Sequence, residues 1–206
     1  MHKIKHTSLW MTGICIIIFI LQNIINGFTD SLILISSSVL ERPWTLITSI
    51  FLHGSFIHLL YNMLGLALFG TILENDIGSK KFLMIFFAAG LSASFISLFF
   101  YNAVLGASGA LFGILGVLAV IRAKMTIWVY FIPMPMYVAA IFWVLLDIFG
   151  ILFPHGIANI AHLAGLGLGI AYGFYIKKPS LKKKEDNTVM FVNEEEMRKW
   201  EDKNMR

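Results

Sequence analysis

The sequence predicts an all-α membrane protein, a six-transmembrane-helix bundle with both termini in the cytoplasm. Hydrophobic residues make up 58% of the 206 residues, charged residues only 14%, and the mean hydropathy is +0.78. Soluble domains carry about 25% charged residues. The charge is also uneven, because residues 1–176 hold 12 charged side chains and the last 30 residues hold 16. This composition excludes a soluble enzyme and a nucleic-acid-binding protein.

Six apolar segments are candidates for spans, since a helix needs about 20 residues to cross the hydrocarbon. The first follows Lys3 and Lys5 but has no small-residue cleavage site after it, so we expect a retained helix. The stretch 29–45 is too short to cross, and it is either an interfacial segment or an amphipathic connector. The spans cover roughly residues 9–28, 46–73, 82–101, 105–121, 127–153 and 157–176.

The basic residues set the predicted orientation. With an inside N-terminus and six spans, 15 of the 16 Lys and Arg residues fall in inside segments, and only Arg42 lies outside. Such a bias is typical of cytoplasmic loops. We therefore expect a membrane domain over residues 1–176 and a charged cytoplasmic tail over 177–206, whose first lysines favour anionic lipid.

Polar side chains inside spans are costly and are functional candidates by default. His58 and Asn62 lie in the outer half of the second span, four residues apart and therefore on one helix face. Ser108 lies one turn into the fourth span, and His162 lies five residues into the sixth, about 7–8 Å deep at 1.5 Å per residue. Three helices thus carry these groups at comparable depth on one side of the membrane.

Small residues predict which helices touch. His162 shares a stripe with Gly165 and Gly169, and the fourth span carries Gly109 and Gly113 at the same spacing. Such spacing lets two helix backbones approach closely. Packing the sixth span on the fourth brings His162 to Ser108.

This pairing predicts nucleophilic catalysis. A serine hydroxyl needs a base within hydrogen-bond reach, and His162 is able to take its proton and later return it to a leaving amine. Free N–H groups at the helix start beside Ser108, together with His58 and Asn62, suit a developing oxyanion. Asp147 is the only acid within the predicted spans. We expect it to cap a helix or bond a loop, as we expect of His53 and His155, which leaves a Ser–His dyad.

Three motifs carry a family resemblance: HGSFIHLLYN in the second span, GASGALFG opening the fourth and AHLAGLGLG in the sixth. In this order, over about residues 40–176, they resemble the rhomboid intramembrane serine proteases. The resemblance implies a rhomboid-like bundle around a water-filled cavity, with Ser108 as nucleophile and His162 as general base. It implies oxyanion donors from His58, Asn62 and the backbone around Ser108 and Ala107.

The resemblance also assigns supporting positions. His53 resembles a residue that supports the first loop, and Gly106 and Gly109 match the glycines that flank the nucleophile. Phe112 stands where the family often has a tyrosine packed on the base, and Thr45 follows Trp44 where many bacterial members have arginine. The family implies a multi-pass cell-membrane endopeptidase that cuts single-span transmembrane proteins near their outer end, without cofactor or metal.

Two other functions remain as alternatives, an inactive rhomboid-like binding module and a small-solute transporter. The first predicts a missing serine or histidine, and both are present. The second predicts polar groups along a through-path, whereas here they gather on one side. A zinc metalloprotease is excluded by the absence of an HExxH motif. Phe142 and Trp143 in the fifth span, with the loop before His162, are candidate gates for substrate.

Overall fold

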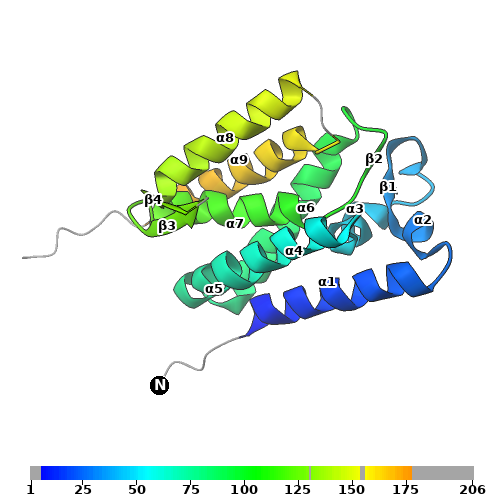
Figure 1. Ribbon diagram of the computed structural model, residues 1–206, viewed down its shortest axis with the longest axis horizontal. Helices are drawn as coiled ribbons and strands as arrows, with labels where there is room; N and C mark the ends of the chain where they lie inside the picture. Colours follow the sequence, from blue (N-terminus) through cyan, green and yellow to red (C-terminus); the bar gives the residue numbers. More distant parts are fainter. Residues whose placement is uncertain (1–5, 130, 154–155, 178–206) are drawn as a thin grey trace, which may run out of the picture.

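The computed structural model describes residues 6–129, 131–153 and 156–177, which form a predominantly helical bundle (Figure 1). Among these residues, four helical stretches are long and apolar enough to cross a membrane. They are α1 (Thr7–Ile24), the continuous stretch Phe56–Ile77, α6 (Ser79–Ser97) and α9 (Asn159–Ile176). Two shorter apolar helices join them, α7 (Ser108–Ile121) and α8 (Met136–Leu152). An α-helical membrane protein is therefore confirmed, and the count of six spans stays a prediction.

The stretch Phe56–Ile77 consists of α4 (Phe56–Gly65), a π-helical segment (Leu66–Gly70) and α5 (Thr71–Ile77). Its start corrects the prediction of a helix from residue 46. The Ser55 hydroxyl accepts the N–H of His58 at 3.1 Å, which caps a helix that begins only at Phe56. Before it lie α3 (Thr45–Thr48) and a 3₁₀ turn (Ser49–Phe51).

The predicted fifth span is wrong over its first nine residues. The described residues there belong to two paired strands, β3 (Thr126–Val129) and β4 (Ile132–Pro135), and α8 begins at Met136. Pro133 and Pro135 explain the difference, because proline lacks the N–H that a helix interior needs. The other predicted boundaries lie within four residues of the observed ones.

The stretch 29–45 is ordered and packs on the chain that enters α7. It contains α2 (Phe28–Leu32), β1 (Leu34–Ile35) and a 3₁₀ turn (Ser36–Ser38). Strand β1 pairs antiparallel with β2 (Ala103–Val104), with Leu34 opposite Val104. This small ribbon fixes the segment immediately before Ser108.

Helix α7 lies between α9 and α4 in the view of Figure 1 and packs against both α6 and α9, and ten of its fourteen residues are buried. A Cβ added at Gly165 would lie 2.0 Å from the Gly109 carbonyl oxygen, and one at Gly169 would lie 2.0 Å from that of Gly113. The backbones of α7 and α9 are therefore in direct contact, and the predicted glycine packing is confirmed. On the α6 side, a Cβ at Gly113 would lie 2.2 Å from the Ala89 Cβ.

Helix α1 is attached to the Phe56–Ile77 stretch at one end and to the loop before it at the other. The buried Glu74 carboxylate accepts the N–H groups of Thr7 at 3.0 Å and Ser8 at 2.9 Å. At the opposite end, the Gln22 amide donates to the His53 carbonyl at 3.2 Å and accepts the His53 N–H at 3.0 Å. Both contacts satisfy backbone groups that would otherwise be unpaired.

Several predictions fall on residues outside the described ranges. They concern Lys3, Lys5, His155 and the charged tail beyond Lys177.

Candidate active site

Ser108 and His162 meet at the β2 end of the bundle. The Ser108 hydroxyl and the His162 Nε2 lie 2.9 Å apart, although 54 residues separate them in sequence. Ser108 is the first residue of α7, and His162 is the fourth of α9. Gly106 has a φ of +126° and donates its N–H to the Ser49 carbonyl at 2.9 Å, which sets the tight turn into α7. The predicted contact between Ser108 and His162 is present.

Asp147 differs from the expectation that it caps a helix or bonds a loop. Its Oδ1 lies 3.0 Å from the His162 Nδ1, so it contacts the imidazole rather than capping a helix or bonding a loop. The residue is 4% exposed, and a buried carboxylate needs a partner. Because an ionised carboxylate only accepts, the Nδ1 carries the proton and donates it to Asp147. The Nε2 is then free to accept from the Ser108 hydroxyl.

Phe112 stacks on the imidazole ring of His162. Its ring and the His162 ring are stacked, with centroids 4.3 Å apart and planes 14° apart. Trp143 of α8 lies next to Phe112, with ring centroids 6.4 Å apart. The predicted packing of an aromatic on His162 is therefore present without a tyrosine hydroxyl.

The predicted oxyanion donors differ in the contacts that their side chains make. A Cβ added at Gly106 would lie 2.8 Å from the His58 Nε2 and 3.8 Å from the Ser108 hydroxyl oxygen, so the His58 ring borders the space beside Ser108. The Asn62 amide donates to the His58 carbonyl of its own helix at 2.9 Å. Ala107 directly precedes α7, whose first N–H groups have no acceptor within the helix.

His53 differs from the expectation that its ring bonds a loop. In the part of the chain that the structure describes, neither ring nitrogen has a hydrogen-bond partner, and the residue is 1% exposed. Its ring packs edge to face on His58, with centroids 5.1 Å apart. Burial, with the neighbouring His58, lowers the pKa of His53 to about 4, so it is neutral at pH 7. The loop bond is made by its backbone with Gln22, a polar residue near the end of an apolar run that the sequence analysis missed.

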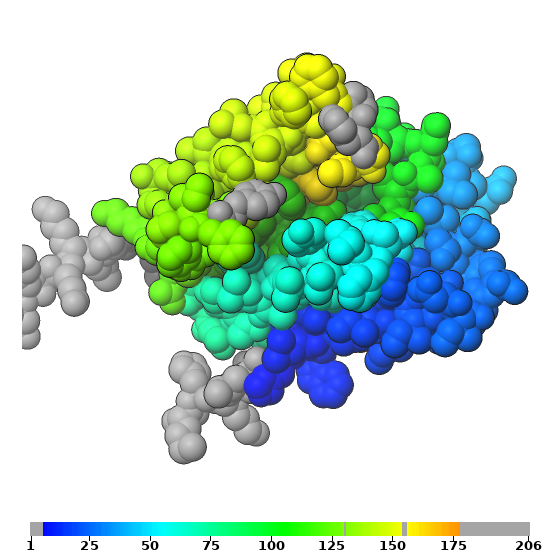
Figure 2. Space-filling model, viewed as in Figure 1, coloured from blue at the N-terminus to red at the C-terminus, as the bar shows by residue number. Residues whose placement is uncertain are grey.

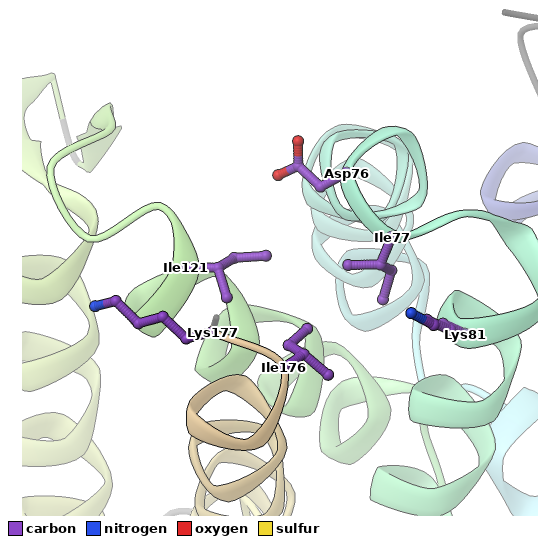
Figure 3. A pocket seen from close by; sticks show the side chains of 6 residues that line it. All are labelled: Asp76, Ile77, Lys81, Ile121, Ile176 and Lys177. Carbon is purple, nitrogen blue, oxygen red and sulfur yellow. The ribbon is translucent and has the colours of Figure 1, made fainter. Parts of the chain in front are cut away.

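Two cavities differ in chemistry. A cavity of about 30 Å³ lies beside Ser108, with Ser94, Ser97 and Gly106 among its lining residues. A larger one of about 360 Å³ lies at the opposite end of the bundle, where Ile77, Ile121 and Ile176 converge and Asp76, Lys81 and Lys177 complete the lining (Figure 3). Ser108 itself lines the smaller cavity. Among the described residues, no cluster of three or more His, Cys, Asp or Glu residues fits a metal ion.

Comparison with known proteins agrees with this geometry. A family model described as the Rhomboid domain matches residues 40–179. The rhomboid protease GlpG of Haemophilus influenzae is 27% identical over 177 residues, covering 83% of this chain and 91% of its own length. The rhomboid protease GluP of Bacillus subtilis is 39% identical over 112 residues, which cover 50% of this chain and 22% of GluP.

A mitochondrial relative is also similar. Rhomboid protein 1 of Saccharomyces cerevisiae is 31% identical over 169 residues, which cover 77% of this chain and 49% of the yeast protein. The matched region is about a third of RHOMBOID-like protein 1 of Arabidopsis thaliana. The chain thus spans half or less of these two eukaryotic relatives.

Proposed function

Because the chain belongs to the rhomboid family of membrane proteins, we propose that it is an intramembrane serine endopeptidase. Its substrates are single-span membrane proteins, whose transmembrane helices it cleaves near their outer end. The observation that carries the proposal is the 2.9 Å contact between the Ser108 hydroxyl and the His162 Nε2. The similarity to GlpG and GluP, both described as rhomboid proteases, supports it.

Acylation follows from this contact. The Ser108 oxygen attacks the scissile carbonyl carbon while its proton passes to the His162 Nε2. The negative charge that forms on the carbonyl oxygen receives hydrogen bonds from N–H groups at the start of α7, with His58 and Asn62 as further donors. His162 then gives its proton to the leaving nitrogen, the C–N bond breaks, and an ester links the substrate to Ser108.

Hydrolysis of the ester needs water at the same place. A water molecule attacks the ester carbonyl and passes a proton to His162, which returns it to the Ser108 oxygen as the new carboxylic acid leaves. The 30 Å³ cavity beside Ser108 is large enough for a water molecule, and the hydroxyls of Ser94 and Ser97 make it polar. This cavity supports a local supply of water in an otherwise apolar bundle.

The proposed setting is the cell membrane, with six spans in residues 1–176, both ends cytoplasmic and a charged tail over 177–206. A peptide bond in a helix is shielded by its own hydrogen bonds, so the substrate must unwind locally before cleavage. On the face shown in Figure 2, α9 is visible between α8 and α4. We propose that the substrate approaches His162 between these two helices, with Phe142 and Trp143 of α8 as gates. The Trp143 ring contacts Phe69 of the facing stretch, with centroids 6.3 Å apart.

The test compares the purified wild type with Ser108→Ala and His162→Ala in detergent, each incubated with single-span test substrates. A fluorophosphonate probe reports the nucleophile separately, because it labels an activated serine without helix recognition. Ser92→Ala is the matched control, since Ser92 lies on α6 and does not line the cavity beside Ser108. We expect cleavage and labelling in the wild type and in Ser92→Ala only. Cleavage that persists in Ser108→Ala would overturn the proposal.

A further inference from the structure

Asp147 is a buried acid on a helix that is otherwise largely exposed at that end. Of the described α8 residues, the buried ones are Met136, Ala139, Ala140 and Asp147, and the first three lie within the first five positions of the helix. The neighbours Leu145, Leu146, Ile148 and Phe149 are exposed on the bundle surface. A carboxylate in an apolar span is costly, so its burial needs a compensating contact.

The compensation comes from the imidazole. The Asp147 Oδ1 accepts the Nδ1–H of His162 at 3.0 Å, whereas the Oδ2 is buried and has no hydrogen-bond partner within residues 6–129, 131–153 and 156–177. Such a carboxylate interacts more favourably with an imidazolium than with a neutral imidazole, because the attraction is strong in a medium of low dielectric. The imidazolium is the form that His162 takes during acylation.

Phe112 and Asp147 constrain His162 in different ways. The stacked Phe112 ring fixes the plane of the imidazole but accepts either ring orientation and either tautomer. The carboxylate selects one orientation, with the Nδ1–H toward α8 and the Nε2 toward Ser108. Together they leave His162 a single arrangement that is competent as a base.

The local sequence of α8 allows this contact. A Cβ added at Gly150, three residues after Asp147 and on the same helix face, would lie 2.5 Å from the Asn159 Nδ2 at the start of α9. The absence of a side chain at Gly150 therefore lets this end of α8 approach α9. The close approach brings the carboxylate within reach of His162.

We propose that Asp147 is a positioning residue that acts through His162, the base of the Ser108–His162 pair. This inference rests on the proposed peptidase function and adds a positioning acid to the dyad expected from the sequence. Its structural consequence is that the base is oriented only while α8 is docked on α9.

Asp147→Asn is the decisive variant, because the amide has the shape of the acid but can donate to the Nδ1. That donation favours the tautomer with its proton on Nε2, which cannot accept from Ser108. We expect kcat and the fluorophosphonate labelling rate to fall by up to about 10⁴-fold, the loss that such a change produces in soluble serine proteases, with KM little changed. Asp147→Ala should lose similar activity and regain part of it in formate. Asp76→Asn, at the opposite end, is the matched control and should keep wild-type kcat.

A packing role predicts a different pattern, in which Asp147→Asn keeps kcat within twofold of the wild type and Asp147→Ala mainly lowers thermal stability. That pattern would overturn the inference.

Proton NMR of histidine-labelled protein tests the contact without catalysis. The strongly downfield Nδ1–H signal expected of this bond should be present in the wild type and in Ser108→Ala but absent from Asp147→Asn and His162→Ala. Its absence from Ser108→Ala would also overturn the inference. Failure of the peptidase proposal alone leaves this NMR result intact.

Discussion

Adding one methyl group at Gly165 tests how the α7–α9 contact maintains the site. The alanine Cβ would lie 2.0 Å from the Gly109 carbonyl oxygen, whereas ordinary contacts begin near 3.4 Å. The helices must therefore separate by about 1.4 Å at this point, because the obstacle is backbone and cannot rotate away. Overpacking of this kind costs about 1–3 kcal/mol of folding free energy.

The separation also reaches the contact between Ser108 and His162. His162 lies one turn before Gly165, so a shift of this size lengthens its 2.9 Å contact with Ser108 beyond hydrogen-bond distance. A misplacement of about 1 Å in an active site lowers rates about 10²-fold. We expect Gly165→Ala to lose at least that much kcat for a single-span substrate and to melt at a lower temperature in detergent.

Two glycines of the same helix provide the comparison. Gly167 has nothing within 4 Å of an added Cβ, so Gly167→Ala should keep activity and stability. Gly169 is as crowded as Gly165, 2.0 Å from the Gly113 carbonyl oxygen, but lies seven residues from His162. Gly169→Ala should lose similar stability and less activity. The reasoning fails if Gly165→Ala and Gly167→Ala have the same melting temperature and the same kcat.

Three further substitutions probe the contacts around the site. Phe112→Ala removes the ring stacked on His162, a contact worth about 0.5–1.5 kcal/mol, and should lower kcat about two- to tenfold, whereas Phe112→Tyr keeps the stack and the rate. Glu74→Gln weakens the carboxylate that accepts two N–H groups of α1 and should lower stability by about 1–3 kcal/mol in a detergent unfolding assay, with kcat of the folded enzyme unchanged. His53→Phe should remove an acid-dependent loss of stability, measured by melting temperature against pH.

The sign of the His53 effect follows from its lowered pKa. Below pH 6.5 the unfolded chain binds a proton at His53, whereas the folded protein binds it only near pH 4, so stability falls as the pH drops between these values. At about 1.4 kcal/mol per pH unit the loss from this group reaches about 3 kcal/mol by pH 4. Equal pH slopes for wild type and His53→Phe would contradict this account.

The other two predictions have their own contrary outcomes. An unchanged kcat in Phe112→Ala would mean that the stack does not orient the base. Unchanged unfolding of Glu74→Gln would mean that the charge of the carboxylate adds nothing to its bonds with α1.

The meeting of Ser108 and His162 was predictable because it depends on glycines at fixed spacing. Gly109 and Gly165 allow close approach at one register, and that register places the two functional groups at one level. Helical periodicity within each span carries this information. Phe112 lies one turn after Ser108, so its position beside His162 could be predicted from the same spacing.

The role of Asp147 was predicted wrongly because its contact with His162 depends on how α8 packs against α9. In an almost uniformly apolar helix, no periodic pattern specifies that packing. Gly150 was the available signal, a small residue one turn from the lone acid. The β3–β4 strand pair was missed by counting apolar residues, although Pro133 and Pro135 argue against a helix there. The late start of α4 had a similar signal in Gly54 and Ser55, a breaker followed by a cap.

The enclosure of α7 has a consequence for the lipid dependence of this protein. At 1.5 Å per residue its fourteen residues span about 21 Å, well short of a typical hydrocarbon thickness of about 30 Å. A helix exposed to acyl chains at that length would force the bilayer to thin around it. Since α7 meets almost only neighbouring helices, membranes of different thickness act on the outer helices first and leave the immediate surroundings of Ser108 the same.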